Sequence, residues 1–422
     1  MNGVSDKRVE YLDNIITEYI TAICCINDSF SEIKAILTQK KNNAIKSMDS
    51  FFSKVKPTSP EDFVKKLKNK PSYIKRFKSI SKEIERSEHA FKILPQSLFI
   101  SIVSQFDVLI AQLIKFIYLY SDNKLLESDC QISFREVIQI GDINKIKEKF
   151  INDRIDSALR DSHSEQIKTL SKLIGNVPLD KVNFWSDFIE MTQRRNLFVH
   201  SKGVVSAQYI NECQRAGVRI DETAIGKTLS VDDNYFTNSF HVFFCMGVLL
   251  SQVIARVLLG DQLLGEIDSV LNNVIYETIC EEKYDIAIAL SEFATAKSTK
   301  HSNKLDEKYF VLNHAQAYKW KGDNEKCREI LSKYDFSESK EDILVAKYSL
   351  EDDVDNVIKS MKSIGSESDI MNEEAFATWE IFKEMRTKDV FQKTFEEIFR
   401  KPLYDSDAAS IVEQTKGIID KS

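Results

Sequence analysis

The sequence predicts an all-α protein, and its composition is the first reason. Glycine and proline mark the many turns of β-sandwiches and barrels, yet this chain of 422 residues has only 12 glycines and 6 prolines. Hydrophobic residues make up 43% and charged residues 29%, a composition that buries cores and is not typical of disorder. The second reason is that apolar residues recur with helical periodicity in most segments.

Net charge and cysteine usage exclude several protein classes. The net charge of −7 argues against a protein that coats nucleic acid over its whole surface, although it allows a local basic patch. The seven cysteines are scattered and never form a C-x-x-C pair, which is typical of a reducing compartment and of neither a disulfide framework nor a zinc site. Residues 1–13 lack the apolar segment of a signal peptide, so we expect a cytoplasmic protein.

Residues 1–94 are predicted to be a helical extension. A long helix is expected over residues 5–45, where one apolar stripe contains Val9, Leu12, Ile15, Ile16, Tyr19, Ile20 and Ile23. A second helix is expected to begin at Ser59-Pro60-Glu61-Asp62, with serine as the N-cap, proline in the first turn and acids at the positive end of the helix dipole.

A basic strip lies within this extension. Between Lys40 and Lys82 there are thirteen Lys or Arg residues against three acids, with Tyr73 and Phe77 interleaved. The strip fits either a solvated helical face, which is the more common case, or a surface that contacts RNA phosphates. The candidate RNA-binding residues are Lys65, Lys66, Lys68, Lys75, Arg76 and, outside the strip, Lys202.

A helical bundle is predicted over residues 95–260. It begins after Pro95 with an apolar helix over 96–120, which is long enough to span a membrane but is interrupted by Gln105, Asp107, Gln112 and Lys115. We expect this helix to be central in a bundle and the protein to have no membrane partner, because an ionised group at mid-bilayer is costly. Further helices are expected near 142–160, 163–174, 180–199 and 235–259.

The third predicted domain, residues 261–422, is an array of helical hairpins. Ala317-Tyr318-Lys319-Trp320-Lys321-Gly322-Asp323 and the next residues up to Cys327 fit the A-Y-x-x-x-G-D turn of a tetratricopeptide repeat. Tyr284-Asp285-Ile286-Ala287 resembles the same turn without its glycine. Because the spacing is not the repeat's 34 residues, the array is expected to be irregular, and an ordinary helical domain remains the alternative.

The most informative motif for function is Arg195-Asn196-x-x-x-His200, near the end of the amphipathic helix that begins around Asp180. Asn196 and His200 share a helix face, whereas Arg195 and His200 are separated by about 140° around an ideal helix. The arginine and histidine therefore converge only if the helix ends near His200 or if two copies meet across a dimer. Arg194 is more simply explained as a partner of Glu190, one turn earlier.

Together with residues 162–166 upstream and 208–209 downstream, this motif resembles the HEPN superfamily, in an uncharacterised bacterial branch. The resemblance covers about residues 95–260. It implies a four-helix bundle, a homodimer in which two motifs face each other in a basic cleft, and metal-independent RNA cleavage. It also implies an activity that is gated and toxic when released, as in anti-phage defence or growth arrest.

The resemblance assigns roles to four residues. His200 would transfer protons, since an imidazole titrates near neutral pH, and Arg195 would bind the phosphoryl oxygens as negative charge develops on them. Asn196 would orient the imidazole or the substrate. Asp107, on the earlier apolar helix, would hold Arg195 or His200, although a purely structural carboxylate is almost equally expected.

The sequence also departs from some patterns and leaves alternatives open. Position 202 is lysine, so tyrosine modification, as in HEPN toxins with an R-x4-H-x-Y motif, is not supported. No metal-ligand spacing involves the histidines and no nucleotide-binding glycine motif occurs, so no metal or cofactor is expected. The alternatives are a non-catalytic scaffold whose C-terminal array binds a protein partner or regulator, and an RNA-binding module without cleavage.

Overall fold

The protein is all-α in the part of the chain that the structure, a computed structural model, describes, namely residues 6–121 and 132–403. Within these ranges it has seventeen α-helices and no β-strand, apart from one isolated bridge between Val204 and Thr228. The chain forms two compact units that divide between Gly260 and Asp261. The predicted boundary between residues 94 and 95 falls inside a continuous helix, and the chain is not divided there.

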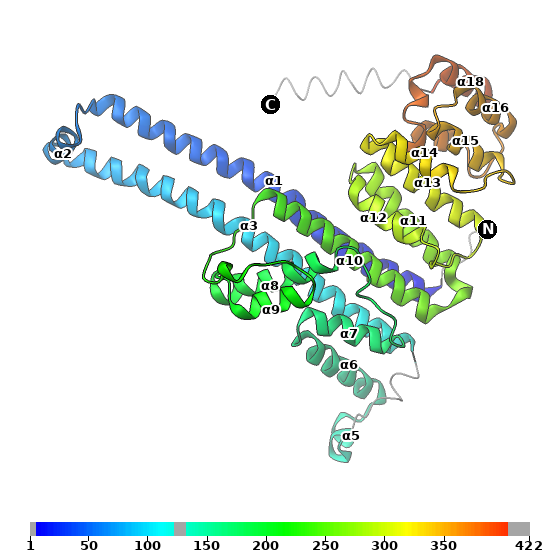
Figure 1. The fold of residues 1–422 in the computed structure, drawn as a ribbon, viewed down its shortest axis with the longest axis horizontal. Helices are drawn as coiled ribbons and strands as arrows, with labels where there is room; N and C mark the ends of the chain where they lie inside the picture. The colour runs from blue at the N-terminus through cyan, green and yellow to red at the C-terminus, as the bar shows by residue number, and fades with distance from the viewer. Residues whose placement is uncertain (1–5, 122–131, 404–422) are drawn as a thin grey trace. The chain divides into compact units, whose positions relative to one another are not determined.

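The first unit is built on a long antiparallel hairpin. Its helices are α1 (Lys7–Val55), α2 (Pro60–Asn69), α3 (Pro71–Tyr120), α5 (Phe134–Ile140), α6 (Ile143–Leu159), α7 (His163–Leu173), α8 (Trp185–Ser201), α9 (Ala207–Arg215) and α10 (Asp233–Leu259). Helices α1 and α3 lie side by side, α10 packs against both, and α8 packs against α3 and α10 (Figure 1). Helices α6 and α7 cover α3, and α9 follows α8.

The first half of α1 belongs to the core of this bundle and is not a separate extension. Its apolar stripe, predicted from residues Val9 to Ile23, is buried against α3 and α10, and Phe30 stacks on Phe236 with ring centroids 4.0 Å apart. The helix also runs ten residues beyond its predicted end at residue 45, as far as Val55. It continues because Phe51 and Val55 are buried in a second apolar cluster at the far end of the hairpin.

That far end is an arm formed by the second half of α1, by α2 and by the first half of α3. An aromatic cluster holds it together, comprising Phe51, Phe52, Phe63, Tyr73 and Phe77. Ser59 caps α2 as predicted, accepting a hydrogen bond from the Asp62 N–H at 3.1 Å. Figure 1 shows α2 at the end of the arm, away from α6, α7, α8 and α9.

Helix α3 does not begin after Pro95, as the sequence predicted, but passes through it. A proline inside a helix removes one backbone hydrogen bond and crowds the preceding turn. The helix survives because its C-terminal half is deeply buried, with Phe99, Ile102, Val103 and Phe106 all inaccessible to solvent. The energy of that burial exceeds the cost of one lost hydrogen bond.

Gly247 allows the three longest helices to approach closely. A Cβ atom built at this position of α10 would lie 2.2 Å from a ring carbon of Tyr19 and 2.9 Å from a methyl carbon of Leu109. The Tyr19 hydroxyl donates to the Phe243 carbonyl at 2.7 Å, one turn before the glycine. The absence of a side chain therefore fixes where α1 and α3 meet α10.

The second unit is a series of helical hairpins. Its helices are α11 (Leu264–Cys280), α12 (Tyr284–Ala294), α13 (Lys304–Lys321), α14 (Asn324–Ser332), α15 (Glu341–Leu350), α16 (Val354–Ile364), α17 (Glu373–Thr378) and α18 (Asp389–Phe399). The turn predicted at Gly322-Asp323 is confirmed, with Gly322 at φ +97° and Asp323 capping α14. Glu282 and Asp352 take the same left-handed conformation in the α11–α12 and α15–α16 turns.

Two helices of the first unit, α3 and α10, are long and apolar enough to cross a membrane by length and composition. The core helix of a bundle meets the same criteria. Of the apolar window of α10, 78% is buried inside the unit, whereas 44% of the window of α3 is buried.

Candidate active site

The candidate motif lies on the last turns of α8. The helix is terminated by Gly203, which takes a left-handed conformation. Helix α8 stops at Ser201, and the Gly203 N–H donates to the Leu197 carbonyl at 2.9 Å. Gly203 has φ +79°, and a Cβ there would lie 2.9 Å from the Phe198 ring and 3.2 Å from the Leu229 carbonyl. The prediction that the helix stops at this glycine is confirmed.

The predicted site residues line one pocket of about 460 Å³ in the first unit. Asp107 comes from α3, and Arg195, Asn196 and His200 come from α8. The segment between α6 and α7, the start of α7 and residues 206–209 complete the wall. A single chain therefore presents the arginine and the histidine of the motif to the same cavity, because α8 ends just after His200.

Arg195 is held loosely at the side of this pocket. One guanidinium nitrogen donates to the Asn196 side-chain oxygen at 3.1 Å, and another lies 3.5 Å from an Asp107 oxygen, at the outer limit of a hydrogen bond. The Nε–H is buried and has no partner among the described residues. About a quarter of the side chain is exposed, so the guanidinium retains donors for a further anion. Asn196 contacts Arg195, whereas the sequence analysis assigned it to the imidazole or the substrate.

Asp107 lies between Arg195 and a second histidine, His163. The Nε2 atom of His163 lies 3.1 Å from the other Asp107 oxygen without forming a hydrogen bond to it. The His163 side chain is only 6% exposed, whereas that of Asp107 is 26% exposed. The carboxylate therefore joins α3, α7 and α8 at the pocket. It contacts Arg195, one of the two partners expected from the sequence, and also His163, which was not expected.

His200 is exposed at the pocket rim, as expected for a group that exchanges protons with a bound molecule. It lies in the last turn of α8. It therefore has access to solvent and to the cavity from the same position.

The pocket has a balanced formal charge and several unsatisfied groups. Arg160 and Arg195 are matched by Asp107 and Asp161, so one chain does not form the basic cleft that the resemblance implied. The Gln166 side-chain oxygen is buried without a hydrogen-bond partner, as is the Arg195 Nε–H. Buried polar atoms without partners are uncommon in native proteins and are often found where a ligand binds.

The other side of α8 carries a second polar cluster, built around Glu190. Its carboxylate accepts hydrogen bonds from Arg194 at 2.7 Å, from the Tyr209 hydroxyl at 2.5 Å and from the Tyr235 hydroxyl at 2.8 Å. Arg194 also stacks 3.8 Å from the centre of the Tyr235 ring and donates to the Ser230 carbonyl. The predicted pairing of Arg194 with Glu190 is confirmed.

The candidate RNA-binding lysines are separated from this pocket. Lys65, Lys68, Lys75 and Arg76 are exposed on the arm, while Lys66 is half-buried and bound to Asp62 and to the Lys56 carbonyl. The aromatic residues interleaved with them pack into the arm's own cluster and form no separate stacking surface. Lys202 is exposed immediately after α8, and of the predicted RNA-binding residues it is the nearest in sequence to the motif.

Sequence reasoning missed His163, and it also missed Arg160, Gln166 and Gln193 in the pocket wall. The sequence marked His163 only as part of a helix start, and Ser162 does cap α7 by accepting from the Glu165 N–H at 3.4 Å. The Glu165 side chain does not return to the Ser162 N–H, as it would in a full capping box, but binds Lys168 at 2.6 Å. No local pattern connects His163 with Asp107, which lies in a different helix.

No group of three or more His, Cys, Asp or Glu side chains in the described residues is arranged to hold a metal ion. Comparisons of the chain with family models, with curated proteins and with solved structures found no match.

Proposed function

We propose that this chain is a metal-independent endoribonuclease of the HEPN type, with its reaction centre at the pocket of Arg195 and His200. The observation that carries the proposal is that one cavity is lined by the arginine, the histidine, Asn196 and Asp107 of the predicted set. A strong anion-binding donor and a proton-exchanging group on one cavity are the two elements that phosphodiester cleavage requires without a metal.

The proposed reaction is an intramolecular transesterification. The ribose 2′-oxygen attacks the neighbouring phosphorus as its proton passes to a base, and the bond to the 5′-oxygen of the next nucleotide breaks. That oxygen takes up a proton, and the products are a 2′,3′-cyclic phosphate and a 5′-hydroxyl. His200 serves as base or acid in this scheme, since it is exposed at the rim where RNA enters. Arg195 neutralises the charge that develops on the non-bridging oxygens.

Asp107 has a positioning role in this proposal. Its two oxygens approach Arg195 and His163, so it restrains the guanidinium without saturating it. Asn196 holds another guanidinium nitrogen from the same helix. Arg195 is therefore oriented by two neighbours and keeps its buried Nε–H available, as expected for a group that must bind a transient anion.

Three wider expectations remain part of the proposal and rest on the resemblance. They are a homodimer through the first unit, a regulator or partner protein on the hairpins of the second unit, and a gated activity that is toxic to the host. A dimer would also supply the positive charge that one chain's pocket lacks, because a second motif would bring its own arginines to the cleft.

The principal test is cleavage of labelled RNA by the purified full-length protein. We expect wild-type protein to generate ends with a 2′,3′-cyclic phosphate, in the presence or absence of EDTA. His200→Ala should abolish cleavage, and His89→Ala, which removes an exposed histidine of α3 that does not line the pocket, should leave it unchanged. RNA binding without cleavage would favour the binding-module alternative, and activity in His200→Ala would refute the assigned role.

A gated enzyme can be silent in a purified sample, so growth provides a second test. We expect overproduction of the wild-type chain to arrest bacterial growth and His200→Ala to relieve the arrest at equal protein levels. Equal toxicity of the two chains would contradict the proposal and would favour the scaffold alternative.

A further inference from the structure

The second unit contains a polar hollow of about 780 Å³ that the proposed ribonuclease activity does not use. Its wall is formed by the end of α12, by the segment 295–303, by one side of α13 and by α14 with the two residues after it. The hollow lies entirely within the residue range of this unit. Its chemistry is distinctive because four lysines line it.

The lining charge is positive. Lys297, Lys304, Lys326 and Lys333 line the hollow together with only two acids, Glu292 and Glu307. Lys326 and Lys333 share a single carboxylate, that of Glu329, at 2.9 and 2.5 Å. Lys297 and Lys304 form no ion pair among the described residues, although Lys304 also interacts electrostatically with Asp335. Several ammonium groups around one concavity attract a ligand with multiple negative charges.

A buried imidazole in the same wall is the second, independent observation. His314 is only 8% exposed, and its Nε2 atom is buried without a hydrogen-bond partner. Burial and the nearby Lys326 and Lys333 lower the pKa of His314 to about 4, so the ring is neutral at pH 7. No group in the described chain satisfies this nitrogen, and the carboxylates of Glu292, Glu307 and Glu329 only partly balance the four lysines, so a phosphate group bound here would meet a remaining positive charge.

The other ring nitrogen of His314 is fixed by Thr295. The Thr295 Oγ1 atom lies 3.2 Å from Nδ1 and also donates to the Ser291 carbonyl at 2.8 Å. Because this donation uses the only hydroxyl proton, Nδ1–H donates to Thr295 and Nε2 carries the lone pair. A phosphate with a P–OH can donate to that lone pair, and a dianion can accept from Nε2 once the ring has taken up a proton.

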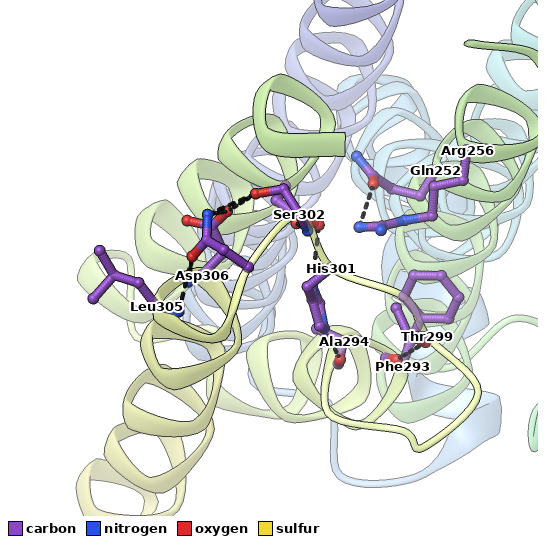
Figure 2. Close-up of polar contacts among 11 residues, drawn as sticks. Gln252, Arg256, Phe293, Ala294, Thr299, His301, Ser302, Leu305 and Asp306 are labelled. Carbon is purple, nitrogen blue, oxygen red and sulfur yellow. Dashed lines mark hydrogen bonds and ion pairs between the residues drawn. The ribbon is translucent and has the colours of Figure 1, made fainter. Parts of the chain in front are cut away.

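The segment that carries Lys297 is held in place by its own polar contacts. Thr299 donates to the Phe293 carbonyl at 2.6 Å, and the His301 ring is fixed between the Ala294 carbonyl at 2.7 Å and Asp268 at 3.1 Å. Figure 2 shows Thr299 and His301 reaching back to the end of α12. The wall of the hollow is thus preformed, which lowers the entropic cost of binding.

We propose that this hollow binds a small molecule that carries more than one phosphate group. A single phosphate is well served by two or three cationic donors, whereas four lysines and the imidazole fit a chain of phosphates. The proposal is independent of the ribonuclease assignment, because it rests on residues of the second unit alone.

The test is binding of pyrophosphate and ATP to the full-length protein, measured by isothermal titration calorimetry at fixed ionic strength. We expect saturable binding of both, weaker binding of inorganic phosphate and no binding of adenosine. Adenosine that binds as tightly as ATP would overturn the proposal, because recognition would then lie in the base. Absence of saturable binding by any phosphate compound would also overturn it.

Variants locate the site and separate it from nonspecific charge attraction. We expect Lys304→Glu and the Lys326→Ala/Lys333→Ala double variant each to weaken ATP binding about tenfold or more, as the loss of charge-assisted contacts implies. Lys359→Glu, at an exposed lysine of α16 outside the hollow, is the matched control and should bind normally. Lys304 begins α13 and is exposed, so its variant should fold even if the double variant does not. Equal binding by Lys304→Glu and Lys359→Glu would refute the site.

Discussion

Arg194 and Arg195 are adjacent on α8, yet their surroundings differ. Arg194 forms a short bond to Glu190, donates to a carbonyl and stacks on the Tyr235 ring. Arg195 has one bond to its neighbour Asn196, a 3.5 Å contact with Asp107 and a buried Nε–H without a partner. The two sides of one helix therefore separate an arginine that completes the structure from one that has donors left for a ligand.

This difference is informative because both clusters are equally polar. A carboxylate that accepts three hydrogen bonds, as Glu190 does, is a stabilising element, and burial together with this carboxylate raises the pKa of Tyr209 and of Tyr235. Both phenols remain protonated donors. On the pocket side, incomplete satisfaction is the property that permits chemistry. Satisfaction of hydrogen bonds thus distinguishes the two clusters where residue type does not.

The largest expected effect comes from exchanging the two arginines for alanine in parallel. We expect Arg195→Ala to lower the RNA cleavage rate about a thousandfold, because it removes the group proposed to neutralise transition-state charge. Arg194→Ala should lower stability but leave the rate per folded molecule within about threefold. Cleavage rates under single-turnover conditions, normalised to folded protein, decide this. Equal rate losses in the two variants would show that Arg195 has no specific role in cleavage.

Glu190→Ala tests the structural side of the helix. The change leaves Arg194 and two tyrosine hydroxyls without their acceptor in a buried position, and we expect it to cost about 3 kcal/mol of unfolding free energy. Urea denaturation measures the loss. The control is Glu212→Ala, which breaks an exposed pair with Arg215 and should change stability by less than about 0.5 kcal/mol. A change below about 1 kcal/mol for Glu190→Ala would mean that the cluster is not a stabilising element.

Asp107→Asn and His163→Gln test the positioning of Arg195. Each keeps the approximate shape of the side chain and removes charge or the imidazole, and we expect cleavage to fall about tenfold to a hundredfold for the first and less for the second. The thermal unfolding midpoints should stay close to wild type, because both contacts are long or poorly aligned. Unchanged cleavage in both variants would place the Asp107–His163 pair outside the reaction.

His314 extends the comparison to the second unit, since it is another buried group with an unused nitrogen. Its folded-state pKa of about 4 lies below the ordinary value of 6.5, so between these values the unfolded chain binds more protons than the folded chain. The contribution of His314 to stability is therefore fully present above pH 6.5, falls as the pH decreases through this window and levels off below pH 4. We expect this loss, about 3 kcal/mol, to be absent from His314→Gln in denaturant titrations. Parallel pH profiles would exclude a buried neutral ring.

The smallest effect is expected on the arm. The triple variant Lys65→Ala, Lys68→Ala, Lys75→Ala removes three exposed charges from the arm. We expect KM for RNA to rise about threefold to tenfold at moderate salt, kcat to stay unchanged and the salt dependence of binding to become shallower. An identical KM in wild type and variant would show that the basic strip is only a solvated face.

Much of the helical organisation follows from local sequence, whereas the completed pocket does not. Ser59, Gly203 and Gly322-Asp323 were predictable because caps and turns depend on a few neighbouring residues. Pro95 misled the prediction, since its local signal for a helix start is outweighed by burial that only the tertiary structure creates.

The candidate site divides in the same way. Arg195, Asn196 and His200 are close in sequence and formed a visible motif, and Asp107 was found only as an acid in an apolar helix. His163 had no signal, because its approach to Asp107 depends on how α7 crosses α3. That Arg194 is hydrogen-bonded to Glu190 and Ser230, whereas Arg195 keeps a donor without a partner among the described residues, could be recognised only from the hydrogen bonds in the structure.

At Gly247 the helices pack so closely that no side chain fits between them. Leu109, whose methyl group lies against it, is two residues from Asp107 on the same helix. A backbone that has no room to slide at one position holds the carboxylate on the opposite side at a fixed height above the cavity. A larger side chain at position 247 would therefore displace α3, and with it the carboxylate of Asp107 that contacts Arg195.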